Sequence, residues 1–285
     1  MPHPAGPQSL PAPDGLSQVA LWTAAAHAAE YGREAPYVRD PWAGDFLHAA
    51  GYRGGPPGDG PMQRLLPEWA VVRSRFFDEH LVAAARAGCR QVVLLGAGLD
   101  TRAFRLDWPT GVHVFEVADP ALLAFKEYVL DGAPVSCGRR SAVGADPAGD
   151  WRAELLAAGF DPARPTAWLA ETLLYHLPPE TVESVVAAMT ELSAPGSTFG
   201  AECVNADTVS SSFVAPFLDA LAATGLAWHW RLAEPERWWV GHHWDARVAD
   251  PFTLPYAVQR LGPFLPMLPE AAARTVFLIT GTLRE

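Results

Sequence analysis

The stretch from Gln91 to Arg102 reads Gln-Val-Val-Leu-Leu-Gly-Ala-Gly-Leu-Asp-Thr-Arg, and it decides the fold. Its apolar start predicts a buried strand, which leads into a Gly-x-Gly turn at Gly96 and Gly98 and then into a helix. The glycines permit a tight turn with close backbone approach to a ligand, and the helix start offers free N–H groups to an anion. Asp100 stands near the place of a third glycine and can cap the helix. This order favours a nucleoside-type ligand over a purely structural turn.

A carboxylate follows this turn at the spacing that nucleoside-binding folds use. Glu116 lies twenty residues after Gly96, at the end of the next predicted strand, Val112–Val117. A carboxylate in that place can accept hydrogen bonds from both hydroxyls of a ribose. We therefore predict that Glu116 contacts the ribose, with Asp119 taking that role if the strand has a different register.

Outward from this unit, strands and helices alternate along the chain. Such alternation predicts a doubly wound, mostly parallel α/β sheet. The predicted strands are Gln91–Leu95, Val112–Val117, Arg139–Val143, Thr166–Ala170, Gly196–Glu202 and Arg274–Thr282. The helices predicted between them are Thr101–Leu106, Pro120–Leu130, Trp151–Ala158 and Pro179–Leu192. Three further helices are predicted before the first strand, at Ser17–Glu30, Tyr37–Ala50 and Leu65–Ala87.

The alternation breaks at both ends of the chain, and this suggests how it is divided. Residues 1–16 are rich in Pro and Gly and are expected to form a flexible tail. We expect residues 17–285 to form a single domain, since this length suits one large α/β unit. Its predicted parts are a helical cap at 17–90, a nucleoside-binding core at 91–202, an aromatic-rich insertion at 203–265 and a final strand at 266–285.

Composition excludes several classes of function. The chain of 285 residues carries a net charge of −11, whereas nucleic acids and anionic membranes are bound by basic surfaces. Its three cysteines, Cys89, Cys137 and Cys203, form neither a metal-binding spacing nor a disulfide framework. We therefore expect a cytoplasmic protein that binds no metal, nucleic acid or membrane.

Two longer strings make the resemblance to a known family specific. Residues 92–106, VVLLGAGLDTRAFRL, and residues 114–120, VFEVADP, resemble the leucine carboxyl methyltransferase family. These are class I S-adenosylmethionine (SAM)-dependent O-methyltransferases and include bacterial polyketide O-methyltransferases. Residues 73–78, 168–178 and 238–244 extend the likeness. The resemblance implies a Rossmann-like methyltransferase sheet with SAM as cofactor.

The resemblance also implies roles at matching positions. Arg73 would pair with the methionine carboxylate of SAM, while Asp146 would accept from the adenine amino group. Glu171 would approach the methionine ammonium or the methyl pocket. An arginine suits a carboxylate, and acids suit an amine or ammonium. The residues expected at the cofactor are Arg73, Gly96, Ala97, Gly98, Asp100, Glu116, Asp119, Asp146 and Glu171.

Four positions depart from the family pattern. Ala118 replaces an acid, Pro147 lacks a backbone N–H that could hold adenine, and Thr172 replaces a glycine. His176 stands where the family has tyrosine, with Tyr175 beside it. These departures leave open a scaffold that has lost SAM and runs a non-methylating acid/base or ring-forming reaction. They also leave open a non-catalytic partner of another pathway enzyme.

The chemistry of the acceptor determines which catalytic groups are needed. A carboxylate is ionised near neutral pH and needs no base, whereas a hydroxyl needs one. We expect His176 to be the first candidate for a base, before His242 and His243, with Tyr175 and Glu171 also at the reacting centre. The expected acceptor is a carboxylate or hydroxyl of a small secondary-metabolite intermediate, which the aromatic segment 228–244 would help to enclose. A protein C-terminus, the family's other acceptor, stays open, as does a homo-oligomer.

Overall fold

The computed structural model describes residues 17–57, 60–207, 212–267 and 275–284, and the tail predicted at 1–16 lies outside these. It confirms the α/β prediction: one mixed sheet has the order β3-β2-β1-β4-β5-β8-β7, and β6 pairs with β5. The strands are β1 (Gln91–Leu95), β2 (His113–Ala118), β3 (Arg139–Gly144), β4 (Thr166–Ala170), β5 (Thr198–Asn205), β6 (Arg231–Leu232), β7 (Trp244–Ala249) and β8 (Val276–Leu283). β1 to β5 pair in parallel, whereas β8 is antiparallel to β5 and to β7.

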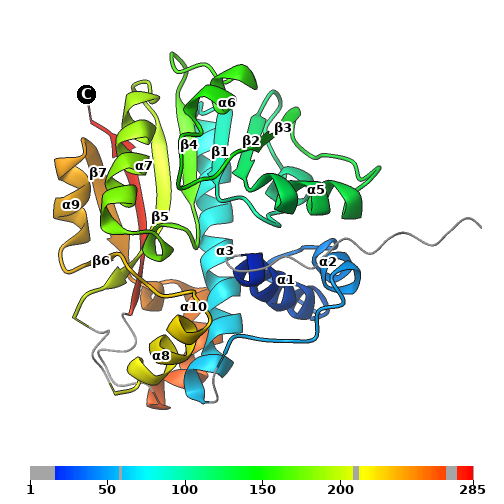
Figure 1. Ribbon diagram of the computed structural model, residues 1–285, viewed down its shortest axis with the longest axis vertical. Helices are drawn as coiled ribbons and strands as arrows, with labels where there is room; N and C mark the ends of the chain where they lie inside the picture. Colours follow the sequence, from blue (N-terminus) through cyan, green and yellow to red (C-terminus); the bar gives the residue numbers. More distant parts are fainter. Residues whose placement is uncertain (1–16, 58–59, 208–211, 268–274, 285) are drawn as a thin grey trace, which may run out of the picture.

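Helices cover both faces of the sheet, and several gather at one end of it (Figure 1). The α-helices are α1 (Ser17–Tyr31), α2 (Ala43–Ala49), α3 (Pro61–Ala87), α4 (Arg102–Arg105), α5 (Pro120–Val129), α6 (Arg152–Ala157), α7 (Pro179–Glu191), α8 (Ala215–Ala223), α9 (Pro235–Gly241) and α10 (Pro255–Leu261). Short 3₁₀ turns lie at Leu174–His176, Pro251–Thr253 and Gly262–Met267. Figure 1 shows α1, α2, α8 and α10 together at one end of the sheet. Within the described residues, we find no helix whose length and apolarity would suit a membrane span.

The strand β1 shows why this sheet forms. All five of its residues are buried, as expected for a parallel strand that helices cover on both faces. Val93 and Leu95 join a core with residues of α6 and α7, while Val92 and Leu94 join a second core with α3. The continuous apolar run therefore fills two cores, one on each face.

The strand order also positions a site. From β1 the chain proceeds outward through β2 and β3, and then returns to place β4 on the other side of β1. Open α/β sheets bind ligands beyond the carboxyl ends of their strands where the order reverses in this way. The junction of β1 and β4 is therefore the place to look for a ligand.

Two predictions about elements need correction. The helix predicted from Tyr37 to Ala50 is only Ala43–Ala49. Part of the predicted insertion, Trp244–Ala249, is the edge strand β7. Its alternate residues Trp244, Ala246 and Val248 pack on the core, because successive side chains of a strand point to opposite faces of the sheet. Trp239 and Trp244 are fully buried against Phe199 rather than around a ligand space. Thus the aromatic segment mostly builds core.

Candidate functional site

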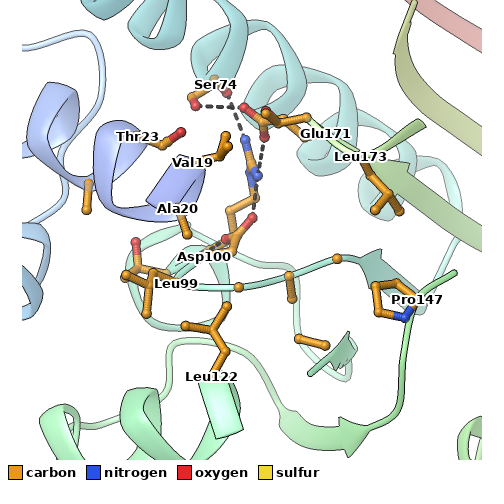
Figure 2. A pocket seen from close by; sticks show the side chains of 18 of the residues that line it. Val19, Ala20, Thr23, Ser74, Leu99, Asp100, Leu122, Pro147, Glu171 and Leu173 are labelled. Carbon is orange, nitrogen blue, oxygen red and sulfur yellow. Dashed lines mark hydrogen bonds and ion pairs between the residues drawn. The ribbon is translucent and has the colours of Figure 1, made fainter. Parts of the chain in front are cut away.

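A cavity of about 430 Å³ lies at the carboxyl ends of β1, β2 and β4 and is bordered by α1. Figure 2 shows Val19, Ala20 and Thr23 of α1 on one side of it, and Pro147 and Leu173 at the other. The predicted residues that line it are Arg73, Gly96, Ala97, Gly98, Asp100, Asp119, Asp146 and Glu171. The structure therefore brings eight of the nine residues predicted for the cofactor to one cavity.

The glycine turn forms the floor of this first cavity. Gly96 has φ +68° and Gly98 has φ +47°, a left-handed conformation that side chains disfavour. A Cβ on Gly98 would lie 3.3 Å from the Cβ of Ala20 on α1, and one on Gly96 would lie 3.1 Å from Leu173 Cδ1. Glycine is thus favoured at both positions by the backbone conformation, and also by the close approach of α1 at Gly98 and of Leu173 at Gly96.

One wall of the first cavity is an ion-pair network around Glu171, which directly follows β4. Its Oε1 lies 2.6 Å from Arg73 Nε, and its Oε2 lies 2.6 Å from Arg102 Nη1. Burial alone raises the pKa of Glu171, but the two guanidinium charges outweigh burial and hold this pKa well below its usual range. Asp100 Oδ1 accepts the backbone N–H of Arg102, the first residue of α4, at 2.7 Å. Glu171 is therefore a fixed negative charge at the cavity wall.

A second chain of polar contacts ends on the same carboxylate. Asp40 Oδ2 lies 3.1 Å from His27 Nδ1, and His27 Nε2 lies 3.0 Å from Ser74 Oγ. The Ser74 hydroxyl in turn donates to Glu171 Oε1 at 2.9 Å (Figure 2). Thr101 Oγ1 also donates to Asp40 Oδ2, at 2.7 Å. All five side chains line the first cavity.

His27 links the two carboxylates of this chain. Its ring contacts Asp40 directly and reaches Glu171 through the Ser74 hydroxyl. Burial raises the pKa of Asp40, but the hydrogen bond with His27 and the charge of Arg105 outweigh burial, so this pKa lies below its usual range. Asp40 is therefore a second ionised carboxylate at the first cavity.

The prediction for Glu116 is wrong. Its side chain is fully buried, with Oε2 at 2.8 Å from Lys126 Nζ and 2.6 Å from Arg140 Nη2, and it does not line the first cavity. The reason is that β2 extends to Ala118, so Glu116 lies inside the strand rather than at its end. Asp119 follows the strand and lines the cavity; its Oδ1 caps α5 by accepting from Ala121 N at 2.8 Å. Asp119, the alternative to Glu116, is therefore the acid that the structure brings to the cavity.

At the far end of the cavity, Asp146 combines two roles. It lines the cavity, and its Oδ1 accepts the backbone N–H of Ala148 at 2.9 Å, which makes it a turn cap as well. Pro147 and Ala118, two of the departures from the family pattern, also line the cavity. Because Pro147 has no N–H and the N–H of Ala148 is already bonded, this end offers a ligand few backbone donors.

The predicted catalytic residues are divided between two cavities. Glu171 lines the first, whereas Tyr175 and His176 line a second, of about 260 Å³. Burial lowers the pKa of His176 to about 4, and burial also raises the pKa of Tyr175 above its usual range. Thr172 lines both cavities and has φ +56°, a strained conformation for a β-branched residue at the place where the family has glycine.

Several residues of the site are not indicated by the sequence. His27, Asp40 and Ser74 come from three different segments, and no local spacing indicates that they meet. Glu202 on β5 was also missed; it is fully buried, accepts the backbone N–H of Thr172 at 2.9 Å and lies 3.6 Å from Arg73 Nε. Burial raises the pKa of Glu202 to about 7. Its only signal in the sequence was an acid inside an otherwise apolar strand.

Comparisons with known proteins agree on a family. A family model described as "Leucine carboxyl methyltransferase" matches residues 20–190. A protein of Saccharopolyspora erythraea is 44% identical over 196 residues, which cover 67% of this chain and 68% of that protein. A protein of Parafrankia sp. is 40% identical over 255 residues, or 86% of this chain and 82% of that one. Both are described as a "putative S-adenosyl-L-methionine-dependent methyltransferase".

A solved structure supports the fold alone. The crystal structure of a DUF574 family protein from Streptomyces avermitilis matches with a TM-score of 0.61. The alignment covers 93% of this chain and 97% of that chain, at 14% sequence identity.

Proposed function

The chain belongs to the leucine carboxyl methyltransferase family, and from that premise we propose that it transfers a methyl group from SAM to a carboxylate or hydroxyl oxygen of a small biosynthetic intermediate. The observation that carries this proposal is the first cavity. There a glycine turn, an acid after β2 and a charged arginine–glutamate pair converge at the junction of β1 and β4. Each group matches one part of SAM.

The residues of the first cavity fit this cofactor in chemistry and in size. Arg73 would hold the methionine carboxylate, and Glu171 the ammonium group. Asp119 would accept from the ribose, since its helix cap uses only Oδ1. Asp146 and the segment after it would border the adenine. A volume of about 430 Å³ lies within the roughly 300–1,000 Å³ of small-molecule sites.

The departures from the family pattern change single contacts and leave the rest in place. Ala118 removes one acid, but Asp119 next to it lines the cavity. Pro147 removes one donor, but Asp146 stays. We therefore infer a SAM site of reduced affinity rather than a site rebuilt for another ligand.

In the reaction, bound SAM supplies an electrophilic methyl group on a sulfonium. The chain's own task is to hold an acceptor oxygen behind that methyl group, because positioning supplies most of the rate in such a displacement. Glu171 is poorly suited to act as a base, since Arg73 and Arg102 stabilise its ionised form. His176, with a pKa of about 4, is a weak base at neutral pH. The site thus favours an acceptor that is already ionised.

The experiment combines the purified protein, SAM labelled in its methyl group, and a heat-treated small-molecule extract of the organism that encodes the chain. We expect label in an extractable product. Treatment with base separates the two acceptors, because a methyl ester releases methanol whereas a methyl ether is stable. Gly98→Val is the control, since a side chain at Gly98 clashes with α1. Cofactor binding without any labelled product across extracts would contradict the proposal and favour a non-catalytic role.

A further inference from the structure

The second cavity directly adjoins the first. Both are lined by Val19, Thr23, Arg73 and Thr172, which lie where the two cavities meet. Arg73 comes from α3 and Thr172 follows β4, so this junction lies beside Glu171. A molecule in the second cavity therefore places one end next to the expected position of the cofactor's methionine.

The body of the second cavity is apolar and largely aromatic. Trp22 comes from α1, Trp69 from α3, and Phe217 and Leu221 from α8. Trp228 completes the wall, with its ring centroid 5.7 Å from that of Phe217 and 5.1 Å from that of Tyr175. Such surfaces stabilise a ligand by removing its hydrocarbon from water.

The polar side chains of this lining are few. They are Thr23, Arg73, Thr172, Tyr175 and His176. Tyr175 lines this cavity together with Arg73 and Thr172, two of the residues that the cavities share. Among the described lining residues there is no aspartate, glutamate or lysine, and Arg73 is the one permanent charge.

We propose that the second cavity holds the methyl acceptor, and that this acceptor is a compact, apolar carboxylic acid whose carboxylate lies at Arg73. The proposal rests on the proposed function and names its substrate class. A peptide is excluded as the buried occupant because each of its residues brings an N–H and a C=O that an apolar wall cannot satisfy. An alcohol fits this cavity less well than a carboxylate, because no aspartate, glutamate or lysine among the described lining residues could take its proton.

Arg73 has enough donors to serve both ligands. A guanidinium carries five N–H groups, of which Nε–H donates to Glu171 and one Nη2–H donates to Thr23. Three N–H groups remain for carboxylates in the two cavities. In the reaction a carboxylate oxygen forms a bond to the methyl carbon as the carbon–sulfur bond breaks. The sulfur keeps the electron pair, its positive charge is lost, and no proton moves.

The test uses octanoate, octan-1-ol and the tetrapeptide acetyl-Ala-Ala-Ala-Leu as probes. Their binding to the full chain is measured by calorimetry, with and without S-adenosylhomocysteine. We expect octanoate to bind roughly tenfold or more tightly than octanol, because its carboxylate forms a charge-assisted hydrogen bond. We expect no binding of the tetrapeptide. Equal affinities for octanoate and octanol, or preference for the peptide, would overturn the proposal.

Matched variants on α1 locate the site. Ala25 lines the second cavity but not the first, so Ala25→Trp should fill it and raise the dissociation constant of octanoate roughly tenfold or more. Ala29 also lines the second cavity and is exposed, so this position tolerates a larger side chain. Ala29→Trp therefore repeats the test if Ala25→Trp does not fold. Ala28→Trp, on the same helix but outside both linings, is the control and should leave octanoate binding unchanged.

The outcomes separate this inference from the proposed function. If S-adenosylhomocysteine binds but octanoate does not, the function stands and the acceptor class is wrong. If octanoate binds and Ala25→Trp blocks it while no S-adenosylhomocysteine binds, the second cavity is a carboxylic-acid site and the methyltransferase proposal fails. Octanoate binding that Ala25→Trp and Ala29→Trp both leave unchanged would overturn the location.

Discussion

The carboxylate of Glu171 lies 2.6 Å from the guanidinium Nε of Arg73, although 98 residues separate the two. Glu171 follows β4 and Arg73 lies on α3, so the pair ties the covering helix to the sheet at the point where the strand order reverses. Both side chains are about nine-tenths buried, at 6% and 11% exposed. An arginine held in this way is ready to receive a ligand carboxylate before the ligand arrives.

The first prediction concerns the shape of this arginine. Arg73→Lys keeps the charge but loses the fork of N–H groups that serves Glu171 and Thr23 together. We expect affinity for S-adenosylhomocysteine to fall roughly tenfold or more, the range for losing hydrogen bonds to a charged group. Arg75→Lys, on the same helix but paired with Glu79, is the control. Equal affinities in the two variants, measured by calorimetry, would contradict this role for Arg73.

The second prediction separates the two acids near the end of β2. Asp119→Asn keeps an oxygen that can cap α5 but removes the charge, so it should weaken S-adenosylhomocysteine binding by about 1–3 kcal/mol. Glu116→Gln leaves Lys126 buried with a weaker partner and should instead lower the free energy of unfolding, by up to about 3–5 kcal/mol. Calorimetry and urea unfolding measure the two effects. If Glu116→Gln weakens binding in a fully folded protein while Asp119→Asn does not, the observed register is not the functional one.

Features that a short stretch of residues determines could be predicted from the sequence, whereas features that depend on contacts between distant segments could not. β1 and β4 begin and end at the predicted residues, because a continuous apolar run of five is a local signal. The role of Glu116 was mispredicted because the strand begins and ends one residue later than predicted, which moves this acid further from the strand end. Such a shift changes no local pattern.

The contacts of His27 could not be predicted at all. It meets Asp40 and Ser74, which are 13 and 47 residues away, only because α1 packs against α2 and α3. Nothing in the sequence near any of the three residues indicates the other two. Helix packing in three dimensions, rather than spacing along the chain, creates this part of the site.

The third prediction tests the contacts of His27. His27→Gln disturbs the contacts with both Asp40 and Ser74. Ser74→Ala removes the link to Glu171 but leaves the contact with Asp40, so it should weaken S-adenosylhomocysteine binding less than His27→Gln does. Calorimetry measures both affinities, and equal losses in the two variants would show that the contact with Asp40 contributes nothing to the site.

The fourth prediction concerns pH and Glu202. Burial raises the pKa of Glu202 to about 7, so the folded state holds a proton that the unfolded chain releases near pH 4.3. The contribution of this proton to the free energy of unfolding is fully present below the pKa that Glu202 has in the unfolded chain. It is lost as the pH rises through about 7. Glu202→Gln cannot titrate, so its stability relative to the wild type should rise by about 1–3 kcal/mol between pH 4.5 and 8.5.

Urea unfolding at several pH values measures this difference, with Glu191→Gln as the control because Glu191 is exposed. A constant difference between wild type and Glu202→Gln across this range would show that Glu202 is ionised throughout.

The most direct test of the central claim is a calorimetric titration of the wild type and of Gly98→Val with S-adenosylhomocysteine. Gly98 has φ +47° and packs against Ala20, so a valine side chain must displace α1 from the glycine turn. We predict clear binding at micromolar concentrations by the wild type, and none by a Gly98→Val protein whose circular dichroism is that of a folded chain. Absence of binding by the wild type, or unchanged binding by the folded variant, would contradict the assignment of the first cavity to SAM.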